Sequence, residues 1–111
     1  MLKAVKKALD KAMSVAPPEE VLGLIKDGAL VLDVRTPEEV KEGIVPGAKN
    51  IPLPELENHL KELPRDRTIV TYCVRGGRAA KAKHLLEANG FKAVNGGGYK
   101  AILKILESTQ R

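Results

Sequence analysis

A single cysteine stands in a segment whose residue types suit chemistry on sulfur. Cys73 is the only cysteine among the 111 residues, and it opens the run Cys73-Val74-Arg75-Gly76-Gly77-Arg78. The two glycines can adopt positive φ at no steric cost, so consecutive backbone N–H groups can turn toward the thiol and hold negative charge. A helix that begins near Arg78 adds the positive end of its dipole. The segment therefore predicts a thiolate nucleophile at Cys73.

Two other interpretations of this segment fit it less well. A lone cysteine is often a small buried apolar residue, but an inert one needs neither the glycines nor two arginines within five residues. Cysteine phosphatases resemble the segment, yet they need five residues between cysteine and arginine to encircle a phosphoryl group, and four separate Cys73 from Arg78 here. The smaller loop suits one extra sulfur atom, whose negative charge in a persulfide the same N–H groups can hold. The spacing favours sulfur transfer over phosphoryl transfer.

The charges around the loop favour an anionic sulfur donor. Residues 74–86 contain four basic residues and no acid, namely Arg75, Arg78, Lys81 and Lys83. A local positive field raises the concentration and capture rate of small anions, and salt weakens it. We expect Arg75 to attract the donor, whereas Lys81 and Lys83 fit an ordinary solvated helix face.

The rest of the chain alternates segments typical of strands and helices. Strands are predicted over 29–34, 48–51, 67–72 and 91–94, and helices over 18–27, 36–43, 54–63, 78–89 and 99–107. Gly96-Gly97-Gly98 is predicted as a flexible turn before the last helix. The alternation predicts an α/β domain with a central, mostly parallel β-sheet flanked by helices on both faces. Ligands of such sheets bind beyond the carboxyl ends of the strands, where Cys73 falls.

Composition excludes several classes of function. Hydrophobic residues make up 43% and charged residues 30%, a balance typical of one globular domain. The net charge is +5, but most of the basic residues alternate with acidic ones along the chain, and only three aromatic residues are present. Nucleic-acid binding is therefore not expected. No metal or cofactor is expected, because there is one cysteine and neither His59 nor His84 has a partner at ligand spacing. No export signal or bilayer-length apolar run is present, so cytoplasm is the expected location.

The chain begins with a basic extension over residues 1–16, which precedes the domain over residues 17–111. Its apolar residues recur at helical spacing over residues 2–13, and Pro17-Pro18 ends the pattern. We expect this helix to lie on the surface of the domain, or to form a contact through which two copies make a homodimer. It is too short and has too few large apolar groups for stable membrane association.

Several motifs together make the chain resemble a single-domain rhodanese, a thiosulfate sulfurtransferase. The resemblance covers residues 18 to about 105 and rests on four segments: Asp33-Val34-Arg35, Gly43 to Pro52, Cys73 to Arg78, and Gly96 to Ala101. Each segment alone is weakly specific, but their order and spacing together are highly specific. The chain departs from the family pattern at two positions, with Ile44 in place of the usual histidine and Ile102 in place of a late tryptophan. We expect altered local packing there and unchanged chemistry.

The resemblance implies a mechanism and roles for the site residues. Cys73 attacks the outer sulfur of thiosulfate, releases sulfite and becomes a persulfide, and cyanide or a thiol then removes the sulfur. The segment Val74 to Arg78 binds the donor, with Arg78 bracing the loop against a carboxylate for which the family suggests Asp33. Asp33 and Arg35 are supporting residues. A sulfur carrier or interaction module, which takes persulfide from a partner protein and passes it on, is the alternative.

Overall fold

The computed structural model describes residues 14–108 and contains one sheet of four parallel strands in the order β2-β1-β3-β4. The strands are β1 (Leu30–Asp33), β2 (Lys49–Asn50), β3 (Ile69–Cys73) and β4 (Ala93–Gly98). The helices are α2 (Pro18–Lys26), α3 (Pro37–Val40), the 3-10 helix η1 (Leu53–Glu62), α4 (Gly77–Ala88) and α5 (Tyr99–Glu107). The predicted α/β class and parallel sheet are confirmed. The predicted helix and homodimer contact over residues 2–13 lie outside the described residues.

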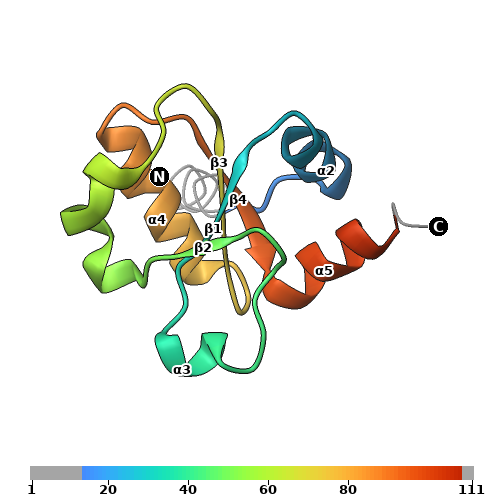
Figure 1. Ribbon diagram of the computed structural model, residues 1–111. Helices are drawn as coiled ribbons and strands as arrows, with labels where there is room; N and C mark the ends of the chain where they lie inside the picture. The colour runs from blue at the N-terminus through green and yellow to red at the C-terminus, as the bar shows by residue number, and fades with distance from the viewer. Residues whose placement is uncertain (1–13, 109–111) are drawn as a thin grey trace, which may run out of the picture.

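Helices cover both faces of the sheet, as Figure 1 shows, with α4 and η1 on one side and α2 and α5 on the other. Successive strand residues point to opposite faces, so each strand contributes to two clusters. Leu32 and Ile69 pack with Leu86 of α4 in the first cluster, while Val31 packs with Ile102 of α5 in the second. Ile102, which stands where the resembled family usually has a tryptophan, is fully buried and belongs to the second cluster.

The carboxyl ends of the two central strands lie at the same edge of the sheet. Asp33 pairs with Tyr72, so β1 and β3 end within one residue of each other. The loop from Cys73 to Arg78, which we call the active loop, leaves β3 at this edge, and α3 follows β1 there (Figure 1). The Tyr72 hydroxyl accepts a hydrogen bond from the Val45 N–H at 3.1 Å, which fastens the connection between α3 and β2 to the sheet.

The prediction of a flexible turn at Gly96-Gly97-Gly98 is wrong, because these glycines belong to β4. A Cβ on Gly96 would lie 2.7 Å from the Val70 side chain and 3.0 Å from the Thr71 carbonyl oxygen. A Cβ on Gly98 would collide with the carbonyl oxygen of Val74 in the active loop. The glycines therefore allow close approach of neighbouring backbone and side chains, a use of glycine distinct from flexibility.

Two helices of the structure differ from the predicted ones in type or in length. The segment predicted as a helix over 54–63 is the 3-10 helix η1, in which Pro54 supplies no N–H and only Leu56 is fully buried. The helix predicted from Thr36 to Gly43 is limited to the four residues of α3. None of the helices within residues 14–108 combines the length and hydropathy that crossing a bilayer requires.

Candidate active site

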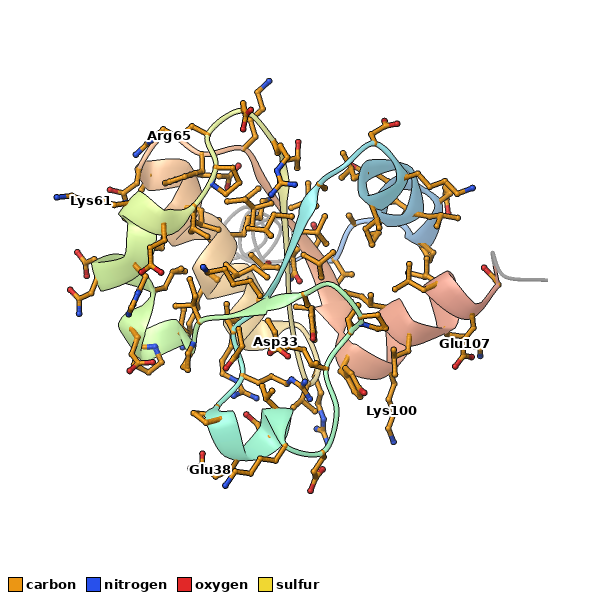
Figure 2. All side chains as sticks on the ribbon, viewed as in Figure 1. Asp33, Glu38, Lys61, Arg65, Lys100 and Glu107 are labelled. Carbon is orange, nitrogen blue, oxygen red and sulfur yellow. The ribbon has the colours of Figure 1, made fainter. Side chains whose placement is uncertain are left out.

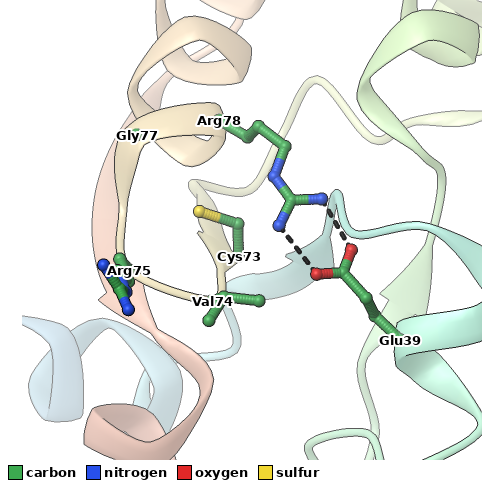
Figure 3. A pocket seen from close by; sticks show the side chains of 6 residues that line it. All are labelled: Glu39, Cys73, Val74, Arg75, Gly77 and Arg78. Atoms are coloured by element: carbon green, nitrogen blue, oxygen red, sulfur yellow. Dashed lines mark hydrogen bonds and ion pairs between the residues drawn. The ribbon is translucent and has the colours of Figure 1, made fainter.

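Cys73 is the last residue of β3, and its thiol lies inside the loop that follows. The residue is 2% exposed, and its Sγ accepts a hydrogen bond from the Gly76 N–H at 3.0 Å. It nevertheless lines a surface cavity of about 380 Å³ (Figure 3), together with Glu39, Val74, Arg75, Gly77 and Arg78. The thiol is thus shielded from bulk water but reachable by a small molecule through this cavity.

Gly76 gives the loop its shape. Its φ of +107° lies in the left-handed region, which a residue with a side chain rarely adopts, and its carbonyl oxygen accepts the first helical bond from the Ala80 N–H. The residue therefore caps α4 while its own N–H donates to the Cys73 sulfur. The start of α4 adds the positive end of the helix dipole beside that sulfur. One backbone N–H and one helix N-terminus thus favour negative charge on Sγ.

Arg78 braces the loop through Glu39, so the prediction of Asp33 as its partner is wrong. The Arg78 guanidinium donates to both oxygens of the Glu39 carboxylate, at 2.6 and 3.0 Å (Figure 3). Glu39 lies on α3, which is at the same edge of the sheet as the loop. The pair joins the first turn of α4 to α3 across the mouth of the cavity.

The Glu39 carboxylate is held in place from two sides. Its Oε1 also accepts from the Thr36 N–H at 2.9 Å, while the Thr36 hydroxyl accepts from the Glu39 N–H, so the two residues form a capping box at the start of α3. The hydrogen bond from Arg78, followed by that from the Thr36 backbone, lowers the pKa of Glu39 to about 2. The Glu39 carboxylate in turn raises the pKa of Arg78. The charge of Arg78 is therefore matched by a neighbouring anion.

Asp33 does not pair with Arg78, because Arg35 donates hydrogen bonds to both oxygens of the Asp33 carboxylate. The Asp33 carboxylate accepts from the Arg35 backbone N–H, from Nε and from Nη2 at distances between 2.7 and 3.0 Å, and both residues are buried. Nη2 also donates to the Gly43 carbonyl at 2.6 Å, and the guanidinium lies 4.4 Å from the centre of the Tyr99 ring. Figure 2 shows Asp33 at the sheet edge above α3. The pair ties β1, the segment after α3 and α5 together beneath the site.

The two remaining loop side chains are exposed. Arg75 makes no ion pair or side-chain hydrogen bond with any residue in the described range 14–108, and Val74 is 46% exposed. Both line the cavity with Cys73, and both also line a second cavity of about 520 Å³ alongside Tyr99 and Lys100. Since Arg78 is paired with Glu39, Arg75 is the loop arginine whose charge no described residue matches.

Of the residues predicted from Cys73 to Arg78, all but Gly76 line the cavity, and Gly76 donates its N–H to the thiol. Asp33 and Arg35 are buried and do not line this cavity. Sequence reasoning missed two residues that hold the loop, Glu39 and Asn95. A signal for Glu39 was present, because Thr36 and Glu39 have capping-box spacing directly after a strand. Asn95 fell between the strand predicted over 91–94 and the turn predicted at Gly96-Gly97-Gly98, so no signal marked it as buried.

Comparison with known proteins agrees with this arrangement. The rhodanese-like domain family matches residues 17–104. A sulfurtransferase of Allochromatium vinosum is 34% identical over 61% of this chain and 64% of its own length. The Escherichia coli thiosulfate sulfurtransferase PspE is 38% identical over 64% of this chain and 71% of its own. The chain thus spans less than two thirds of the Allochromatium protein.

Solved structures share the fold. The crystal structure of reduced Bacillus anthracis CoADR-RHD superposes with a TM-score of 0.76 at 33% identity, over 96% of this chain and 19% of that one. The human single-domain sulfurtransferase TSTD1 gives a TM-score of 0.69 at 28% identity, over 81% of this chain and 95% of its own. With a family match over most of its length and an active loop at the carboxyl edge of a parallel sheet, this chain belongs to the rhodanese-like domain family.

Proposed function

We propose that the protein is a sulfurtransferase that carries a sulfane sulfur on Cys73, with thiosulfate or a similar anion as donor. The observation that carries the proposal is the position of the Cys73 sulfur, which accepts an N–H from Gly76 at 3.0 Å and lines a surface cavity. A terminal sulfur added to Sγ would enter this cavity. Negative charge developing there meets the N-terminus of α4 and Arg75, which has no ion-pair partner among residues 14–108.

The reaction we propose has two steps that balance without a redox partner. The Cys73 thiolate attacks the outer sulfur of thiosulfate, an Sγ–S bond forms, and the S–S bond of the donor breaks as sulfite leaves with the electron pair. A nucleophilic acceptor, cyanide or a thiolate, then attacks the outer sulfur of the persulfide. The Cys73 thiolate leaves with the second electron pair and the free enzyme is restored.

The charge arrangement supports an anionic donor and assigns its attraction to one residue. Arg78 is matched by Glu39, and Arg35 is matched by Asp33. Arg75 is exposed and lines the cavity, so its charge acts on whatever approaches Cys73. Because this charge lies at the surface, salt should weaken donor capture.

The test is thiocyanate formation from thiosulfate and cyanide, with Cys73→Ser as the essential variant. Cys73 is the only cysteine, so every thiol-dependent product must come from it. We expect the substitution to abolish thiocyanate formation, and activity that survives it would refute the mechanism. Hydrolysis of an aryl phosphate by the wild-type protein would refute the preference for sulfur over phosphoryl transfer.

A sulfur carrier that receives its sulfur from a partner protein is the second candidate. The exposure of Val74 at the mouth of the cavity favours it, because an apolar side chain beside the reactive sulfur suits contact with another protein surface. A carrier would accept sulfur from a persulfidated protein and form little thiocyanate from small donors. Fast turnover of thiosulfate would decide in favour of the enzyme.

A further inference from the structure

A buried asparagine connects the sheet to the active loop. Asn95 lies within β4 and is 1% exposed. Its Nδ2 donates to the carbonyl oxygen of Gly76 at 3.0 Å, and its Oδ1 accepts from the Gly97 N–H at 2.9 Å. Both ends of the side-chain amide therefore have partners, and one partner is the residue whose own N–H donates to the Cys73 sulfur.

The orientation of this amide is determined by its partners. Because a backbone N–H faces one end, that end must be the oxygen, and the NH₂ group must face the Gly76 carbonyl. The Asn95 backbone is fixed as well, since it pairs with Thr71 of β3 and its carbonyl accepts from the Ala16 N–H at 2.8 Å. The donor to Gly76 is thus held by the edge strand β4, through its pairing with β3 and its bond to Ala16.

Gly76 depends on such a partner more than other residues would. With φ at +107° and no side chain, its backbone has few steric limits, so its orientation is set by its hydrogen bonds. Its carbonyl accepts from Asn95 and from the Ala80 N–H, and its N–H donates to Sγ. Loss of the Asn95 bond would leave the buried carbonyl with one partner and free the residue to turn its N–H away from the sulfur.

We propose that Asn95 is a positioning residue for the Cys73 thiolate, acting through the Gly76 backbone to hold an N–H donor on the sulfur. The role concerns the proposed sulfur-transfer site, but it predicts a property of the thiol that can be measured without sulfur transfer.

The test is the rate of Cys73 alkylation by iodoacetamide as a function of pH, in the wild type, Asn95→Leu and Asn95→Ala. Leucine matches asparagine in size without hydrogen bonds, and alanine covers the case in which leucine packs poorly. We expect alkylation at pH 7 to slow about fivefold, the effect of one lost hydrogen bond. At about pH 10, where an ordinary thiol is ionised, the rates should converge with the wild type. The charged groups that share the cavity with the thiol, Glu39, Arg75 and Arg78, are unchanged in both variants.

Asn50→Ala is the matched control. Asn50 also donates through Nδ2 to backbone carbonyls, those of Asp33 and Arg35 at 2.9 and 3.1 Å, but it lies on β2 and away from Gly76. Its substitution should lower the melting temperature without changing the alkylation profile. Equal alkylation in the Asn95 variants and the wild type overturns the proposal. The proposal is also overturned if alkylation of the Asn95 variants is slowed equally at every pH, or if Asn50→Ala slows alkylation by the same factor. Failure of both Asn95 variants to fold overturns it as well.

Sulfur transfer supplies a second, separable measurement. If the proposed function holds, the Asn95 variants should lose kcat for thiosulfate while KM changes little, because Arg75 still attracts the donor. An inactive wild type with a normal Asn95 effect on alkylation would reject the function and keep the positioning role. An active wild type whose kcat is unaffected by Asn95→Ala would reject the positioning role alone.

Discussion

Neutralising Glu39 should weaken the brace of the active loop by an amount that depends on pH. Glu39→Gln keeps the size of the side chain and an oxygen that can accept from the Thr36 N–H, so the cap of α3 is retained. It removes the charge that binds Arg78 in the bidentate pair. Glu39→Ala also removes the acceptor of the Thr36 N–H, while the Thr36 hydroxyl can still accept from the backbone N–H of residue 39. The two variants therefore separate the ion pair from the side-chain half of the capping box.

The expected size follows from the exposure of the pair. The side chains of Arg78 and Glu39 are 34% and 32% exposed, so solvent screens their attraction. A partly exposed bidentate pair contributes about 1 kcal/mol, and loss of the hydrogen bond from the Thr36 N–H to the Glu39 side chain costs about 1 kcal/mol more. For a domain of this size we expect the melting temperature to fall by about 5 °C for Glu39→Gln and by about 10 °C for Glu39→Ala.

The pH dependence has a definite sign. The pKa of Glu39 is lowered to about 2 in the folded protein, below the ordinary value of 4.5. A carboxyl with a depressed folded pKa stabilises the protein fully above its unfolded pKa and loses that contribution as pH falls toward the folded value. The difference between wild type and Glu39→Gln should therefore be constant above about pH 5 and shrink between pH 4.5 and 2.

Urea unfolding at a series of pH values measures this difference, with Glu38→Gln as the control. Glu38 precedes Glu39 on α3, and its side chain has no ion pair or hydrogen bond with other described residues. Figure 2 shows it on the outer side of that helix. We expect the control to match the wild type within a few tenths of a kcal/mol. A Glu39→Gln variant as stable as the control at pH 7, or a difference that grows in acid, would refute the bracing role.

Two further predictions concern the shape and the charge of the loop. Gly98→Ala should destabilise the protein in thermal unfolding, because its Cβ would collide with the Val74 carbonyl. Gly23→Ala, which adds a Cβ in open space on α2, should stabilise it by about 0.5 kcal/mol. Equal effects of the two substitutions would contradict the close-approach argument. Arg75→Gln should lower kcat/KM for thiosulfate about fivefold at low salt and less at high salt. The control is Lys92→Gln, which removes the same charge from an exposed residue at the opposite end of the sheet. An equal loss in both variants would indicate an effect of net charge instead of a local role of Arg75.

The order of elements and the position of the thiol were predictable because both depend on local sequence. Apolar runs, proline after Thr36 and glycine after the helices mark strands and helix ends without reference to the rest of the chain. Cys73 falls at the end of one such run, so the carboxyl edge of the sheet could be assigned to it.

What failed were inferences about which distant groups meet. The family pattern suggested Asp33 for Arg78, but Arg35 is only two residues from Asp33 and takes that carboxylate completely. The glycines of β4 suggested flexibility, although the neighbouring chain leaves no room for a side chain there. Both outcomes depend on contacts between elements, which periodicity does not report.

The most direct measurement of the central claim is the intact mass of the protein after incubation with thiosulfate and removal of the excess donor. The account predicts a gain equal to one sulfur atom on the wild type, located at Cys73 by fragmentation, lost on addition of cyanide and absent in Cys73→Ser. A wild-type protein that gains no sulfur from thiosulfate or from a persulfidated protein, or a Cys73→Ser variant that gains it equally, would contradict the account.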